Sequence, residues 1–245
     1  MLMLASDPAA FTPFSQTHAI VAGSHVLAMV LLVVLGRAWR GREAGQSLHV
    51  LWTAFVTIVQ LINVVFWSTP PRLNPADSLP LHICDLAGLI AIVALITEAR
   101  WARLLMFYWG IGLSTQAFVT PVITDAPETM RFQLFFLSHL TIVATPIYDV
   151  LVRGFRVTWR DYAWAVVFTL AYGGVVIPLN MLTGWNYGYA GESVPGNPTI
   201  IDKLGAWPLR LLWMAAIVFT LFAILTAVAR AIFGDESGVT RRSRP

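Results

Sequence analysis

The segment Leu79-Pro-Leu-His-Ile-Cys-Asp-Leu-Ala-Gly88 opens an apolar run that continues as Leu89-Ile-Ala-Ile-Val-Ala-Leu-Ile96. It places His82, the single cysteine Cys84 and Asp85 within four positions at the start of that run. An imidazole, a thiol and a carboxylate enter hydrocarbon only at a free-energy cost. The segment therefore predicts a membrane-spanning helix with a functional site at its start.

The composition is that of a membrane protein. Of the 245 residues, 57% are hydrophobic and 12% are charged, whereas a soluble domain averages about 25% charged residues. The mean hydropathy is +0.70 and the sequence pI is about 9.4. The basic residues lie beside the apolar stretches, which favours a role in membrane orientation over nucleic-acid binding. We predict an all-α polytopic membrane protein without a nucleic-acid partner.

Seven apolar stretches have close to the length of about 20 residues that a helix needs to cross a bilayer. They cover residues 18–36, 48–68, 79–97, 101–119, 132–151, 162–182 and 207–230. Prolines interrupt the chain between the second and third stretches, and Pro80 suits the first turn of the third helix, where its missing N–H costs nothing. We expect one integral membrane domain over residues 1–245, with a disordered tail over residues 234–245.

The basic residues predict the orientation. If there are seven spans, 12 of the 16 basic residues lie on one side, namely Arg37, Arg40, Arg42, Arg100, Arg103, Arg153, Arg156, Arg160, Arg230, Arg241, Arg242 and Arg244. The other side holds Arg72, Arg131, Lys203 and Arg210. The positive-inside rule then predicts an outside N-terminus and a cytoplasmic C-terminus. We expect a multi-pass protein of a bacterial cytoplasmic membrane.

Polar side chains gather in the outer-leaflet half of this arrangement, while Asp149 in the inner half is expected to pair with Arg153, four residues on. The candidate catalytic residues are His82, Cys84, Asp85 and His139, and the candidate substrate-binding residues are Gln60, Asn63, Gln116, Asn180, Asn186 and Tyr187. Asn186 and Tyr187 lie in the long 183–206 loop, which forms either an interfacial belt or a cap over a cavity. Single Asn and Gln side chains often only bridge helices. Together, an intramembrane Asp, two His and a Cys predict a functional site.

Helical geometry limits the roles of these residues. At about 100° per residue, His82 and Asp85 share a face, whereas Cys84 points about 160° away from His82. His82 is therefore a poor base for Cys84 and a good partner for Asp85, and His139 is expected to form the opposite wall. A metal site of His82, Asp85 and His139 is chemically possible, but no HExxH-like spacing supports it. We expect no metal and no cofactor.

Three segments carry a family resemblance. Leu79-Pro-Leu-His-Ile-Cys-Asp85 resembles the signature of the YwaF-like bacterial integral membrane proteins, whose animal relatives are the transmembrane protein 164 family. Arg131-Phe-Gln-Leu-Phe-Phe-Leu-Ser-His-Leu-Thr-Ile-Val-Ala-Thr-Pro-Ile-Tyr148 resembles that family's helix with a histidine followed by Pro-Ile-Tyr. Asn180-Met-Leu-Thr-Gly-Trp-Asn-Tyr187 resembles the bacterial Asn…Asn-Tyr stretch.

The resemblance implies a fold related to the androgen-induced-gene-type lipid hydrolases. It also implies transfer of a fatty acyl chain onto an ether lysophospholipid, with a cysteine nucleophile and a histidine partner. His82 and His139 match the family's histidines. Leu81 occupies the position of the animal branch's cysteine, and Cys84 follows three residues later.

Three hypotheses follow. The first is an acyltransferase or hydrolase that acts on acyl esters of phospholipids, with His139 as general base, Cys84 as nucleophile, Asp85 orienting His82, and Asn180 or Gln116 stabilising an oxyanion. The second is a transporter or binding protein for a polar or lipidic solute, in which His and Asp carry protons. The third is a non-catalytic scaffold. Membrane lipids are the expected partner, and the oligomeric state stays open.

Overall fold

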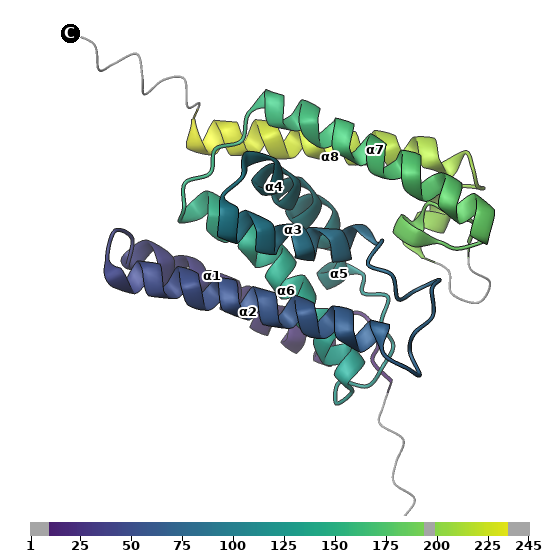
Figure 1. The fold of residues 1–245 in the computed structure, drawn as a ribbon, viewed down its shortest axis with the longest axis horizontal. Coiled ribbons are helices and arrows are strands. Elements are labelled where there is room, and N and C mark those ends of the chain that lie inside the picture. Colours follow the sequence, from purple (N-terminus) through teal and green to yellow (C-terminus); the bar gives the residue numbers. More distant parts are fainter. Residues whose placement is uncertain (1–9, 194–198, 235–245) are drawn as a thin grey trace, which may run out of the picture.

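The computed structural model describes residues 10–193 and 199–234, and this part of the chain contains helices and no strands. Most of the predicted tail, residues 235–245, lies outside the described residues. Figure 1 shows the helices running back and forth between two ends of an elongated bundle. The elements are α1 (Gln16–Ala38), α2 (Glu43–Ser68), α3 (Ile83–Thr97), α4 (Arg100–Leu105), η1 (Met106–Ser114), α5 (Gln116–Val119), α6 (Met130–Leu151), α7 (Trp159–Thr183), η2 (Tyr187–Tyr189), η3 (Ile200–Leu204) and α8 (Arg210–Phe233).

Five of these helices are long and apolar enough to cross a membrane: α1, α2, α6, α7 and α8. The two other predicted spans differ from simple helices. The third is the 15-residue helix α3, which is about 22 Å long at 1.5 Å per residue. The fourth is divided into α4, the π-helix η1 and the short α5. The structure therefore confirms an all-helical membrane protein, while the number of spans stays a prediction.

Polar caps set several helix starts. The Ser15 side chain accepts the His18 N–H at the start of α1, and the Thr129 side chain accepts the Phe132 N–H at the start of α6. Thr158 forms a capping box with Asp161 at the start of α7. These side chains accept N–H groups that have no partner inside the helix.

The start of α3 lies later than the sequence predicts. Pro80 precedes the helix instead of occupying its first turn, because His82 adopts an extended conformation (φ −68°, ψ 145°) as the N-cap. Asp85 is the third helical residue, and its carboxylate contacts the backbone N–H of His82. This is half of a capping box, in which the third helical side chain reaches back to the N-cap N–H.

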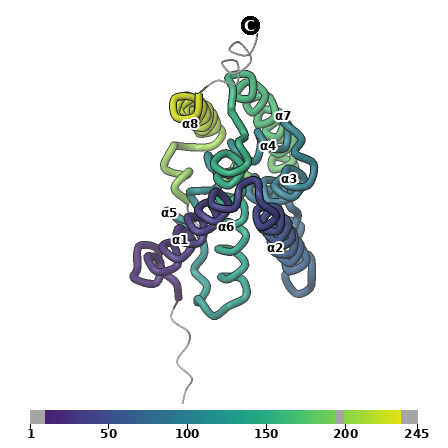
Figure 2. The backbone as a smooth tube through the Cα atoms, turned by 90° about the vertical axis from the view of Figure 1, so that its left-hand side faces the viewer, coloured from purple at the N-terminus to yellow at the C-terminus, as the bar shows by residue number. Residues whose placement is uncertain are grey.

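Helix α6 lies at the centre of the bundle, where it packs against α1, α2, α3 and η1 (Figure 2). In its most apolar window 78% of the residues are buried inside the protein, against 11% for α1 and for α8. The outer helices therefore present their apolar side chains to lipid. Gln60 of α2 is nearly fully buried and donates to Thr141 Oγ1 of α6 at 2.7 Å.

Helix η1 packs closely against α6 at Gly110, which has no side chain. A Cβ atom on Gly110 would lie 2.6 Å from the Ile142 carbonyl oxygen and 3.1 Å from Pro146 Cγ. Within η1, the Ser114 hydroxyl donates to the Trp109 carbonyl, five residues earlier, at 3.0 Å. π-Helical turns are rare and often accompany functional sites.

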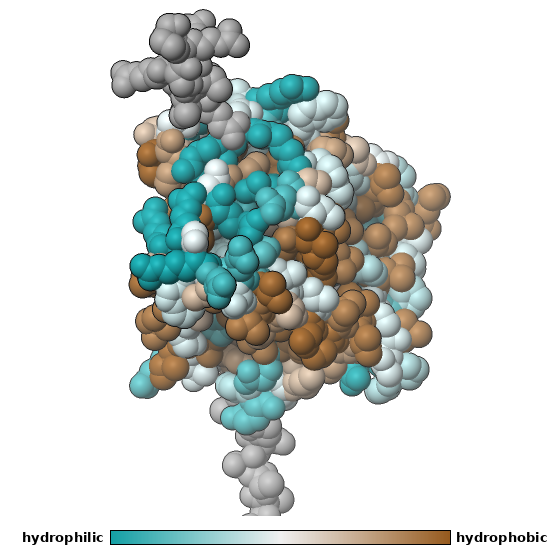
Figure 3. All heavy atoms as spheres, turned by 60° about the vertical axis from the view of Figure 1, so that its left-hand side comes forward, coloured by the Kyte–Doolittle hydropathy of each residue, from teal (hydrophilic) through white to brown (hydrophobic). Residues whose placement is uncertain are grey.

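Ion pairs gather at the end of the bundle where α6 ends and α7 begins. Figure 3 shows a group of hydrophilic residues next to a largely hydrophobic surface. Arg103 binds Asp149 through two hydrogen bonds of 2.8 Å, and Arg100 binds Asp161 in the same two-pronged way. The expected Asp149–Arg153 pair is wrong as the main contact of Asp149. Arg153 instead binds Glu98, and Arg103 of α4 takes both oxygens of the Asp149 carboxylate.

Candidate functional site

The predicted site residues fall into two groups. His82, Cys84 and Asp85 at the start of α3 lie beside the loop that follows α7, which contains Asn186 and Tyr187. His139 and Gln60 belong to the α6 neighbourhood. Neither a hydrogen bond nor a ring contact joins His82 to His139 within the described residues, so the opposite-wall arrangement stays a prediction.

The His82 ring lies between two tyrosines. Its centroid is 4.9 Å from that of Tyr187 and 5.8 Å from that of Tyr189. The Gly188 backbone N–H donates to His82 Nδ1 at 3.3 Å. Because Nδ1 accepts this hydrogen bond, a neutral His82 carries its proton on Nε2. His82 is therefore set up as a hydrogen-bond donor at Nε2.

Asp85 does not take the predicted position beside the His82 ring. Its carboxylate contacts the His82 backbone N–H, and the Gly188 backbone occupies the ring nitrogen instead. The predicted shared helical face assumed that both residues are helical, whereas His82 is the extended N-cap that precedes α3. Asp85 thus fixes the start of α3 through the backbone.

Cys84 lies in an apolar cluster with α4, η1 and α7 residues. The Ser114 hydroxyl oxygen lies 3.5 Å from Cys84 Sγ. Because its own proton goes to the Trp109 carbonyl, this oxygen accepts the hydrogen bond from the thiol. Among the described residues no histidine makes a hydrogen bond to this thiol. Its predicted role as nucleophile therefore receives no support from a neighbouring base and stays a prediction.

His139 has the opposite tautomer to His82. Its Nδ1 lies 2.7 Å from the Phe135 carbonyl oxygen, and a carbonyl can only accept, so Nδ1 carries the proton and Nε2 carries the lone pair. Pro146, seven residues on, lies within about 20° of His139 on the helix and contacts Gly110 of η1. The buried His139 side chain therefore belongs to the face of α6 that packs on η1.

Several of the predicted substrate-binding residues are engaged by the protein itself. Gln60 bridges α2 and α6, and Asn63 is buried one turn away. The Asn180 amide accepts the Tyr187 N–H at 3.0 Å and donates to the Tyr187 carbonyl at 2.9 Å. The Asn186 side chain accepts the Gly191 N–H. These amides hold the helices and the loop in place.

The fully buried Tyr187 ties the loop to the segment before α3. Its hydroxyl donates to the Pro75 carbonyl at 2.6 Å and accepts the Leu79 N–H at 3.0 Å. Tyr172 of α7 adds a second tie, because its hydroxyl donates to the Leu81 carbonyl at 2.8 Å. The position of His82 is therefore fixed from two sides.

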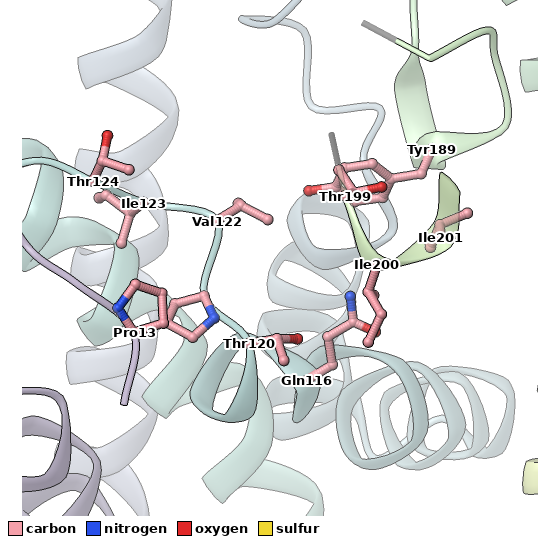
Figure 4. Close-up of a pocket in the computed structure, with 11 residues that line it drawn as sticks. Pro13, Gln116, Thr120, Val122, Ile123, Thr124, Tyr189, Thr199, Ile200 and Ile201 are labelled. Carbon is pink, nitrogen blue, oxygen red and sulfur yellow. The ribbon is translucent and has the colours of Figure 1, made fainter. Parts of the chain in front are cut away.

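Gln116 and Tyr189 line a cavity of about 270 Å³, and Figure 4 shows both side chains at its edge. The remaining wall comes from residues 120–124, from residues 199–201 and from Pro13. Burial, more than the nearby Cys84 and Asp85, raises the pKa of Tyr189 to about 12. Its hydroxyl is therefore neutral at physiological pH and can donate a hydrogen bond.

Sequence reasoning did not single out Tyr172, Gly188, Tyr189, Ser114 or Arg210. The Gly184-Trp-Asn-Tyr-Gly-Tyr189 stretch signals a turn at the membrane interface, but not that Gly188 contacts a histidine 106 residues earlier. Arg210 is 1% exposed and binds Asp202, Ser193 and the Gly191 carbonyl. In the sequence, Arg210 is distinguished only as one of the basic residues on the predicted outer side.

The TMEM164 family model matches residues 13–226. The chain belongs to the TMEM164 family. In this TMEM164-family protein the match covers α1, α2, α6 and α7 in full and α8 up to residue 226, and it includes His82, Cys84 and His139. It confirms the predicted relation, whereas the narrower YwaF-like resemblance stays a prediction. Neither the curated proteins nor the solved structures include a match.

Proposed function

We propose that this protein is a seven-span membrane enzyme that cleaves or transfers acyl esters of membrane lipids, with its N-terminus outside and its site in the outer-leaflet half. Membership of the TMEM164 family supports a lipid-related membrane protein. The ion-paired arginines at one end of the bundle and the candidate site at the other support the orientation. By the positive-inside rule the arginine-rich end faces the cytoplasm.

The observation that carries the proposed chemistry is the opposite tautomers of the two histidines. His139 offers an Nε2 lone pair and serves as general base. His82 offers an Nε2–H donor and stabilises developing negative charge. A base and an oxyanion donor are the two groups that ester cleavage requires.

In the proposed reaction, His139 Nε2 takes a proton from water while the water oxygen attacks the ester carbonyl carbon. The tetrahedral oxyanion accepts a hydrogen bond from His82 Nε2–H. The bond between the carbonyl carbon and the alcohol oxygen then breaks, and protonated His139 returns its proton to the leaving oxygen. The products are a fatty acid and a lipid with a new hydroxyl group. An acceptor alcohol in place of water gives acyl transfer.

The Cys84→Ser variant decides whether Cys84 is the nucleophile. If Cys84 is the nucleophile, Cys84→Ser removes nearly all turnover, because a serine hydroxyl without a base is a much weaker nucleophile. If the histidines act directly on water, Cys84→Ser retains turnover. The Ser114 contact and the apolar surroundings of Sγ favour the second outcome.

The deciding experiment measures release of labelled fatty acid from lipid esters by the full chain in nanodiscs. We expect His139→Gln and His82→Gln each to lower kcat/KM by about 100-fold or more, as is typical for general acid–base groups. His25→Gln is the matched control, since its Nδ1 contacts the Val21 carbonyl within α1, and it should stay within about twofold. Nitrogen-15 chemical shifts of His82 and His139 report the tautomers independently of turnover. Unchanged turnover in both variants, or the same tautomer for both rings, would contradict the proposal.

A further inference from the structure

The cavity beside Tyr189 is built from parts of the chain that are distant in sequence. Gln116 comes from α5, Val122 and its neighbours from the segment after α5, and Thr199 and Ile200 from the start of η3 (Figure 4). Its volume of about 270 Å³ lies just below the roughly 300–1,000 Å³ of small-molecule pockets. It can hold a compact group with a few oxygen atoms, while a long acyl chain must extend beyond it.

The lining of this cavity is polar but uncharged. Its polar side chains are Gln116, Tyr189, Thr120, Thr124 and Thr199, and no Lys, Arg, Asp or Glu is among the described residues that line it. Amides and hydroxyls both donate and accept hydrogen bonds, so they suit hydroxyl groups and ester carbonyls. Isoleucine and valine side chains supply the rest of the wall.

A phosphate group would need a cation or an unoccupied helix N-terminus. The Thr199 N–H at the start of η3 already donates to Asp202. Arg210 is buried against Asp202, and Arg131 pairs with Asp125 at 3.1 Å. Among the described residues, the lining of the cavity therefore contributes no charged group that would bind a phosphate-bearing headgroup.

Tyr189 joins this cavity to the proposed catalytic residues. It lines the cavity, and its ring lies 5.8 Å from the ring of His82. An ester carbonyl bound beside Tyr189 is thus in the neighbourhood of the His82 Nε2–H donor. Gln116 lies two residues after Ser114, which contacts Cys84.

We propose that this cavity binds the uncharged glycerol and ester portion of a neutral glyceride, so that monoacyl- or diacylglycerols, and not phospholipids, are the substrate class. The assignment as substrate rests on the proposed acyl-ester function, whereas binding of the glyceride does not. It replaces the phospholipid substrate expected from the sequence with a neutral glyceride.

The test measures equilibrium binding of radiolabelled 1-monooleoylglycerol to the full chain in nanodiscs, using the His139→Gln protein so that turnover does not interfere. Oleoyl lysophosphatidylglycerol and oleoyl lysophosphatidylcholine are the comparison ligands, because they share the acyl chain and add a phosphate. We expect the monoglyceride to bind about 10-fold or more tightly than either, since a buried phosphate without partners is costly.

Two variants locate the binding. Val122→Trp fills the cavity from its rim and should weaken monoglyceride binding by about 10-fold or more. Gln116→Met keeps the side-chain size and removes the amide, which should weaken binding about 2- to 10-fold, the effect of one net hydrogen bond. Val119→Trp and Gln133→Met are matched controls outside the cavity and should bind as the parent protein does.

The outcomes separate the two proposals. Equal monoglyceride binding in Val122→Trp and its control, or tighter binding of the lysophospholipids, overturns the cavity assignment. Turnover of phospholipid esters without monoglyceride binding overturns this inference and leaves the proposed function standing. Monoglyceride binding in the cavity without turnover of any ester by the unsubstituted protein overturns the proposed function and, with it, the assignment as substrate.

Discussion

Gly188 lies where the loop, α7 and the candidate site meet. Its φ is +64°, its N–H donates to His82 Nδ1, and a Cβ atom added to it would lie 2.4 Å from the Tyr172 hydroxyl oxygen. Gly188→Ala therefore has two costs. The left-handed backbone costs about 1–2 kcal/mol for a residue with a Cβ, and the forced displacement of packed atoms costs about 1–3 kcal/mol. We expect a loss of about 2–5 kcal/mol in unfolding free energy.

Gly184→Ala isolates the first of these costs. Gly184 has a similar φ of +73°, but nothing lies within 4 Å of an added Cβ, so the loss should be about 1–2 kcal/mol. Tyr172→Phe tests the second cost by removing the hydroxyl that the new methyl group would meet. In the Tyr172→Phe background, Gly188→Ala should cost about 1–3 kcal/mol less than in the parent, and so approach the value for Gly184→Ala.

The assay is SDS-induced unfolding in mixed micelles, followed by the fluorescence of the 10 tryptophans. Turnover gives a second measurement, because displacement of the Gly188 N–H releases the His82 ring from its donor. Gly188→Ala should lower kcat/KM about 10- to 100-fold more than Gly184→Ala does. Equal stabilities of the two alanine variants, or no rescue by Tyr172→Phe, would refute the proposed packing at this point.

Two further predictions concern charged groups. Asp149→Asn leaves Arg103 without its carboxylate partner, and the side chains of Asp149 and Arg103 are only 6% and 15% exposed. The loss in unfolding free energy should therefore be about 3–5 kcal/mol in the SDS-unfolding assay. Glu98→Gln, at a side chain that is 55% exposed, should cost under about 1 kcal/mol in the same assay. Hydrogen bonds from Ser193 and the Thr199 N–H, with Arg210 nearby, lower the pKa of Asp202 to about 2, below its unfolded value of about 3.9. Between about pH 2 and pH 4 the folded protein therefore binds fewer protons than the unfolded chain. The Tm of the parent should exceed that of Asp202→Asn by its full margin above about pH 4, and this margin should shrink as the pH falls from about 4 to about 2. A margin that stays constant over this range would contradict the prediction.

Hydropathy was enough to predict the long helices, because a lipid-facing helix must be apolar over most of its length. Helix α8 (Arg210–Phe233) lies within a few residues of its predicted span, residues 207–230. The π-helix η1 was not predictable in this way. Its register depends on the close contact of Gly110 with the Ile142 carbonyl, and a contact between separate helices leaves no periodic signal in either one.

The site was predicted in its residues but not in its contacts. The choice of His82 rested on its depth in the third span, and the structure places it beside two tyrosines. The expected Asp85–His82 side-chain pair assumed that both residues are helical. His82 is instead the extended N-cap, so the wheel that relates residues inside a helix does not apply to its ring.

The described part of the loop after α7 forms a fixed wall of the site. Asn180 holds the Tyr187 backbone at two points, Trp207 Nε1 donates to the Ala190 carbonyl at 3.1 Å, and Arg210 binds the Gly191 carbonyl. Opening this segment as a lid would leave the buried Arg210 guanidinium without its partners, which is costly. The orientation of the His82 ring is therefore set before a ligand binds, and a donor that needs no reorganisation stabilises an oxyanion most effectively.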